Sequence, residues 1–132
     1  MNIADNLALY LVAQGLVTAS GVTRLFMPAS PDNCVTVYPT GGPVSDVKDG
    51  YDDRDVKVRV RNTDGATAIM VAENIYGALQ GLGNITFVDG SYLVLCEAQQ
   101  SAPIFIGRDE LDRYEFTLNL RLHVRNKTTN RI

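Results

Sequence analysis

The sequence predicts an α+β protein with a single domain over residues 1–132, in which a mixed or antiparallel β-sheet is flanked by two main helices. A length of 132 residues suits one domain of ordinary size. Residues 114–124 alternate strictly between apolar and polar side chains, which is typical of a long strand with one buried face. Two stretches with helical spacing of apolar residues can cover that face.

The N-terminal part predicts one helix and two strands. Apolar side chains recur at helical spacing across residues 2–14, and Gly15 ends the helix. We expect short strands over residues 23–27 and 34–38. Pro39 is expected to end the second strand, because proline has no N–H to donate to a ladder.

The middle of the chain predicts a loop, a strand and the second helix. Residues 40–54 are rich in Gly, Pro and Asp and show no hydrophobic period, so we expect a long loop. Residues 55–61 alternate between valine and charged side chains, as in a strand. Thr63 or Asp64 can cap a helix over residues 66–80. Its expected core stripe is Ile69, Ala72, Tyr76, Leu79 and Leu82.

The C-terminal part predicts four further strands and a tail. The strands are expected over residues 85–88, 92–97, 102–106 and 114–124. Asp89-Gly90 is a strong signal for a tight hairpin between the first two. The last residues, 126–132, are polar, and we expect a flexible tail.

Charge is unevenly distributed along the chain. The net charge of −3 argues against a dedicated nucleic-acid binder. Residues 46–55 hold five acids, whereas the chain from Arg121 onward holds four cations and no acid. Opposite patches can register identical subunits head to tail, so we expect the acidic loop to contact a basic strand or tail of a neighbour. The expected interface residues are Asp49, Asp52, Asp53, Arg59, Arg61, Arg121 and Arg125.

Two other interpretations of these charges stay open. The cations can line a surface that faces passing DNA, or all of the charged side chains can face solvent. The spacing of the residues does not decide between these surfaces.

Signals for catalysis are weak. The single histidine, His123, has no nucleophile and orienting acid in a recognisable pattern. Cys34 and Cys96 lie in apolar runs, as buried free thiols do, and we expect no metal site and no cofactor. A metal-dependent nuclease is the main enzymatic alternative, because Asp89 and Glu97 could hold a divalent ion. Gln99, however, stands where such enzymes usually carry lysine.

One segment carries a resemblance to a known family. Residues 28–42 read PASPDNCVTVYPTGG, residues 58–61 read VRVR, and a helix with Ala68, Ala72, Ile75 and Leu79 follows. This order, behind an N-terminal helix, resembles the minor capsid and tail-terminator (head–tail joining) proteins of long-tailed bacteriophages. The likeness spans nearly the whole chain, although no single motif in it is as specific as a catalytic signature.

The resemblance implies a non-enzymatic virion protein assembled in the host bacterial cytoplasm. Such proteins form a ring, commonly a hexamer, that caps the tail tube and joins it to the head. The implied partners are further copies of the chain, tail-tube proteins and head-completion or connector proteins, and DNA passes through the ring without specific recognition. No membrane partner is expected, because no apolar stretch approaches the roughly 18 residues that span a bilayer. The non-enzymatic alternative is a soluble adaptor that captures a peptide or protein on a sheet edge.

Overall fold

The structure, a computed structural model, describes residues 2–45 and 50–125. The described elements, in chain order, are α1 (Ile3–Ala13), β1 (Val22–Arg24), β2 (Cys34–Gly41), β3 (Tyr51–Asn62), α2 (Gly65–Leu79), β4 (Ile85–Thr86), β5 (Tyr92–Ala98), β6 (Ile104–Arg108) and β7 (Tyr114–Arg125). Within these residues the strands form one sheet in the order β1-β2-β3-β7-β5-β4, and β6 pairs with β7 beside this path. The predicted α+β class is confirmed.

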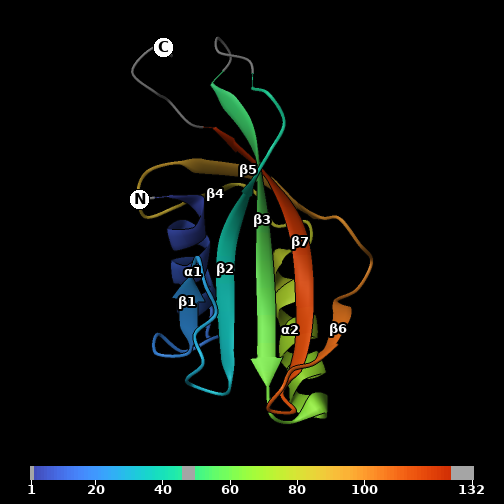
Figure 1. The fold of residues 1–132 in the computed structure, drawn as a ribbon. Coiled ribbons are helices and arrows are strands. Elements are labelled where there is room, and N and C mark those ends of the chain that lie inside the picture. The colour runs from blue at the N-terminus through green and yellow to red at the C-terminus, as the bar shows by residue number, and fades with distance from the viewer. Residues whose placement is uncertain (1, 46–49, 126–132) are drawn as a thin grey trace.

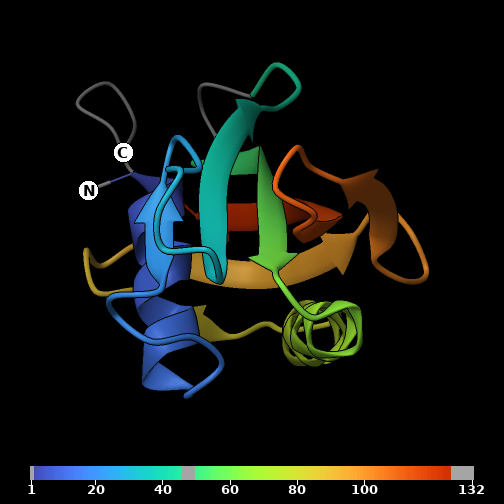
Figure 2. The same ribbon diagram turned by 60° about the horizontal axis from the view of Figure 1, so that its bottom comes forward.

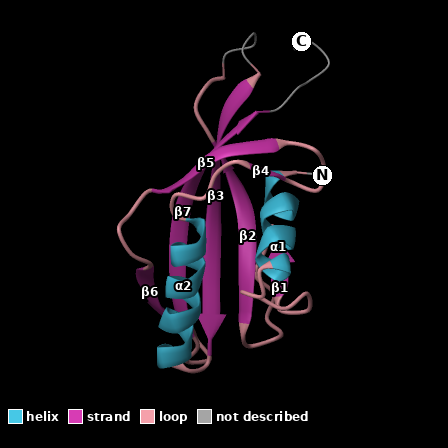
Figure 3. Ribbon diagram, turned by 180° about the vertical axis from the view of Figure 1, so that it is seen from behind, coloured by secondary structure: helices cyan, strands magenta, loops and turns pink. Residues whose placement is uncertain are grey.

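The sheet is mixed and strongly curled. β1 and β2 are parallel, and every other described pair is antiparallel. Both helices lie on one face of the sheet (Figure 3). β5 crosses the upper ends of β3 and β7 (Figures 1 and 2). Two strands share one edge of β7: residues 120–125 pair with β5, and residues 114–117 pair with β6.

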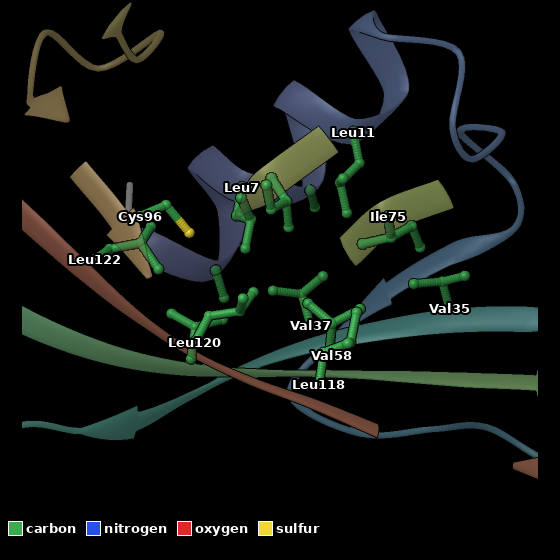
Figure 4. Packing of buried hydrophobic residues seen from close by; sticks show 14 of the residues in the cluster. Leu7, Leu11, Val35, Val37, Val58, Ile75, Cys96, Leu118, Leu120 and Leu122 are labelled. Carbon is green, nitrogen blue, oxygen red and sulfur yellow. The ribbon is translucent and has the colours of Figure 1, made fainter. Parts of the chain in front are cut away.

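The core lies between the helices and the sheet. Leu7 and Leu11 of α1 and Ile75 of α2 point toward the strands, where Val58 and Leu118 face them (Figure 4). All five of these side chains are fully buried. The alternation predicted for residues 56–60 and 114–124 is therefore confirmed, and it places the odd-numbered residues of β3 and β7 on the face away from the helices.

Capping side chains fix the starts of both helices. Asn2 and Asp5 form a reciprocal capping box at α1, and the Asp64 carboxylate accepts the Thr67 N–H at the start of α2. Gly15 follows α1 with a φ of +72°, a left-handed conformation that suits glycine, as expected for the residue that ends this helix. No helix in the described ranges combines the length and apolarity needed to cross a bilayer.

The loop predicted over residues 40–54 is shorter than expected. β2 continues through Pro39 to Gly41, with a register shift between these two residues that accommodates the missing proline N–H. β3 begins at Tyr51, because its acidic start pairs with β7 rather than facing solvent as a loop. Residues 46–49 of the loop and the predicted tail, residues 126–132, lie outside the described residues.

The buried face of α2 also differs from the prediction. Ala68, Ala72, Ile75 and Leu79 are fully buried, whereas Ile69, expected in the core, is 45% exposed. The small side chains of Ala68 and Ala72 allow the helix to pack close to the sheet, so the face of α2 that carries them is the buried one. Sequence periodicity could not distinguish these two neighbouring stripes.

β1 ends earlier than expected, at Arg24. The predicted strand included Leu25, whose φ of +75° turns the chain out of the sheet. The side chains of Leu25 and Phe26 consequently point to the surface, where they are 62% and 67% exposed.

Candidate functional site

The face of the sheet that the helices leave uncovered is lined by polar and charged side chains of β3 and β7. We call this the polar face; it comprises Asp53, Asp55, Lys57, Arg59 and Arg61 of β3 with Glu115, Thr117, Asn119, Arg121 and His123 of β7. The two strands pair along their whole length. Most residues that the sequence predicted for a subunit interface lie here, within one subunit.

Asp55 and Arg121 form a cross-strand ion pair on the polar face. The guanidinium donates to both carboxylate oxygens, from Nε at 2.8 Å and from Nη2 at 3.1 Å. The hydrogen bond from Arg121 holds the pKa of Asp55 below its ordinary value. This acid and this cation, predicted to meet across a subunit boundary, satisfy each other inside the chain.

A second pair joins Arg59 to Glu115, with 2.8 Å between Nη2 and Oε1. Partial burial acts to lower the pKa of Arg59, but hydrogen bonds with Tyr38 and Glu115 outweigh it and raise the pKa. The cations that could line a surface facing DNA are therefore interleaved with acids, which makes the polar face mixed in charge and a poor match for a uniformly charged partner.

Arg61, expected on an exposed surface, is only 4% exposed. Its Nε donates to the carbonyl oxygen of Asp32 at 3.0 Å, and its Nη2 donates to that of Pro31 at 2.7 Å. Arg61 thus holds the loop between β1 and β2 against the sheet.

His123 lies between two carboxylates from neighbouring strands. Its Nδ1 contacts Asp53 of β3, and its Nε2 lies 3.3 Å from Oε2 of Glu97 on β5. Burial lowers the pKa of His123, but the hydrogen bonds to Glu97 and Asp53 and their charges raise it above the ordinary value of 6.5. When it is protonated, the imidazole forms ion pairs that link β7 to β3 and to β5.

We expect this link to stabilise the fold more at about pH 6 than at about pH 8.5. Because the folded pKa is raised, the contribution is complete below the unfolded pKa and is lost as pH rises through the folded pKa. The difference in unfolding free energy between wild type and His123→Gln, measured by urea titration, should shrink by up to about 1 kcal/mol over that range. A difference that stays constant with pH would contradict the ionic link.

The remaining predicted interface residues lie near the ends of β3 and β7. Asp52 is buried and accepts a hydrogen bond from Arg54 at 3.2 Å. The guanidinium of Arg125 lies 6.0 Å from the ring centroid of Tyr51. Asp49 lies outside the described residues.

Arg113 is a structural cation that sequence reasoning missed. It binds the carboxylate of Asp109 at 2.7 Å, the carbonyl oxygen of Ala29 at 2.7 Å and the carboxylate of Asp32 at 3.2 Å. With Arg61 it fixes the β1–β2 loop. The sequence shows only an arginine beside the last strand, and nothing in its spacing indicates partners 81 and 84 residues away.

The residues of the nuclease alternative contact different partners. The Asp89 carboxylate accepts hydrogen bonds from Ser91 and Asn6, whereas Glu97 faces His123. Among the described residues no group of three or more His, Cys, Asp or Glu side chains is placed to hold a metal ion.

Both cysteines are free thiols. Cys34 and Cys96 are buried, and burial raises the pKa of Cys96 to about 12, which keeps this thiol protonated and unreactive.

The fold is shared with a protein of known structure. A solved structure, the virion of a native gene transfer agent particle, contains a chain that is similar over 92% of this chain and 94% of its own, with a TM-score of 0.60 and 20% sequence identity. At that identity the likeness shows a shared fold. No curated protein matches the chain.

A family model specifies the class further. The model described as bacteriophage tail terminator protein matches residues 10–126. The chain therefore belongs to the bacteriophage tail terminator family and is a structural protein of the virion. The resemblance drawn from the sequence is confirmed.

Proposed function

We propose that copies of this chain form a ring, with six subunits as the expected number, that caps the phage tail tube and joins it to the head. The observation that carries the proposal is the family match over residues 10–126. The partners are tail-tube and head-completion or connector proteins, and DNA passes through the ring without specific recognition. Assembly takes place in the host bacterial cytoplasm, and the protein has no enzymatic role.

The polar face supports a role in which the subunit is a rigid building block of the ring. Its ion pairs lie between strands of one chain, so they stabilise the sheet before any neighbour arrives. The charged residues predicted for the interface (Asp49, Asp52, Asp53, Arg59, Arg61, Arg121 and Arg125) remain a proposal as contacts to another subunit. A neighbour that reaches Arg59 or Arg121 would meet a cation that is already paired.

Removing the protein tests the function. In cells that make the particle without this chain, we expect electron microscopy to show tails of uncontrolled length and heads that carry no tail. Supplying the wild-type chain from a plasmid should restore tails of uniform length joined to heads. Normal particles in its absence would contradict the proposal.

A further inference from the structure

Two exposed apolar patches lie at opposite edges of the sheet. The first, which we call the β6 patch, consists of Ile104, Phe105 and Ile106, which are 42%, 55% and 48% exposed. In the described part of the chain β6 pairs only with β7, so its outer edge is uncovered. Proteins usually protect such an edge with charged side chains or proline, but three consecutive large apolar side chains stand here.

The β6 patch is anchored to the core. The ring of Phe105 packs on that of Phe116 with 5.2 Å between centroids, and Phe116 is buried. Phe116 therefore holds the ring of Phe105 in place, and the other side of that ring faces solvent.

The second patch, which we call the β1 turn, consists of Leu25 and Phe26, directly after β1 at the other edge. The Leu25 N–H donates to the Val37 carbonyl oxygen at 3.1 Å, and the Thr23 hydroxyl donates to the Phe26 carbonyl oxygen, also at 3.1 Å. These bonds hold the turn in place although leucine rarely adopts a positive φ. The turn thus presents two apolar side chains outward in a defined conformation.

The two patches lie at the same level of the sheet. Arg24, the last residue of β1, pairs with Val37 of β2. Val37 pairs with Val58 of β3, and Val58 pairs with Leu118 of β7. Ile104, the first residue of β6, pairs with the adjacent Thr117. Figure 1 shows β1 and β6 at similar height on opposite sides of the subunit.

The strand directions also suit a lateral contact. β1 runs parallel to β2, and each step from β2 through β3 and β7 to β6 is antiparallel, so β1 and β6 run in opposite directions. When copies stand side by side in one orientation, β6 of one meets β1 of the next as an antiparallel pair, the more stable arrangement.

We propose that the β6 patch of one subunit packs against the β1 turn of a second copy, so that the sheet edges adjoin around the ring. The inference rests on the proposed ring and identifies its contact surface. Two different patches on one subunit make a head-to-tail contact, which closes into a ring when each subunit is rotated relative to the last. The twist between successive strands turns the two edges relative to each other and provides such a rotation.

A second copy suits these edges better than a captured peptide. A peptide ligand would need one open edge, whereas this chain exposes apolar side chains at both edges and at matching levels. The charged side chains of the polar face between the two edges are already paired within the chain.

Two charge substitutions test the contact. We expect Phe26→Asp and Ile104→Asp each to weaken self-association by about 30-fold or more, because each places a carboxylate in the centre of the contact. Both positions are exposed, so circular dichroism and thermal melting should match wild type. Val88→Asp, at a 75% exposed residue in the β4–β5 turn, is the matched control and should associate as wild type does.

Mixing the two variants gives the decisive readout. Phe26→Asp keeps an intact β6 patch and Ile104→Asp keeps an intact β1 turn, so an equimolar mixture should form a heterodimer and nothing larger. Sedimentation velocity at high protein concentration measures this. If the wild-type chain assembles under these conditions, a mixture that gives only monomers would overturn the proposed contact, and so would variants that assemble like wild type.

Cross-linking covers the case in which the free wild-type chain is monomeric. The double variant Phe26→Cys/Ile104→Cys, expressed in cells that make the particle, should give a ladder of oligomers on a non-reducing gel after oxidation. Each single cysteine variant should give no ladder. A single variant that forms dimers through its own cysteine would show a symmetric contact and refute the head-to-tail one.

The proposed function and this contact fail in different ways. If both Asp variants still produce tails of uniform length and head-to-tail cross-links are absent, the contact is wrong and the capping role stands. If tails stay uniform without the wild-type chain, the capping role is wrong whatever the mixing experiment shows.

Discussion

Leu118→Ala should lower the free energy of unfolding by about 3–4 kcal/mol, within the range for leucine removed from a rigid core. Leu118 is fully buried in β7, lies opposite Val58 and faces the helices (Figure 4), so its truncation leaves a cavity in the packed core. Urea denaturation followed by circular dichroism measures the change.

The matched control for this substitution is Leu111→Ala. Leu111 is 67% exposed, so the same chemical change there should cost no more than about 0.5 kcal/mol. Equal losses at the two positions would mean that the core is not packed as the structure shows.

The second large effect is expected from Arg61→Ala, which should destabilise the subunit by about 2–4 kcal/mol. The substitution removes the two hydrogen bonds from the charged guanidinium to the carbonyl oxygens of Pro31 and Asp32, and a hydrogen bond to a charged group contributes roughly 1.5–3 kcal/mol. The urea midpoint of the purified chain, measured at low protein concentration, should fall.

Arg61→Lys tests whether the positive charge alone, without the guanidinium geometry, stabilises the subunit. A lysine keeps the positive charge but cannot supply the two fixed N–H donors of a guanidinium, so it should recover only part of the lost stability. If Arg61 acted mainly at an exposed subunit interface, both variants would keep the wild-type midpoint and lose assembly alone. That result would contradict the anchoring role.

Period-2 alternation predicted β7 and the later part of β3. In β7 the apolar residues from Phe116 to Val124 all lie in the core, because a one-residue slip would expose every one of them. The N-cap of α2 could be predicted for a similar reason, since Asp64 accepts the N–H of Thr67 only three residues away.

Features that depend on long-range pairing were not readable. The acidic start of β3 appeared as a loop because nothing local shows that Asp55 pairs with Arg121 and Asp53 with His123. For the same reason, these charged side chains were predicted to contact a neighbouring subunit. The family resemblance indicated a ring, but the exposed edges at Phe26 and Ile104 emerge only once the strand order is known.

β5 and β6 pair with different halves of one edge of β7. These two shorter strands therefore form no ladder with each other. β6 is a five-residue strand that pairs only with β7 among the described strands, and its three large apolar side chains are each about half exposed. Local opening of β6 would uncover the ring of Phe116, but it would break only the ladder between β6 and β7 and leave the β3–β7 and β5–β7 ladders in place. A partner that covers β6 would therefore stabilise this strand without rearranging the rest of the sheet.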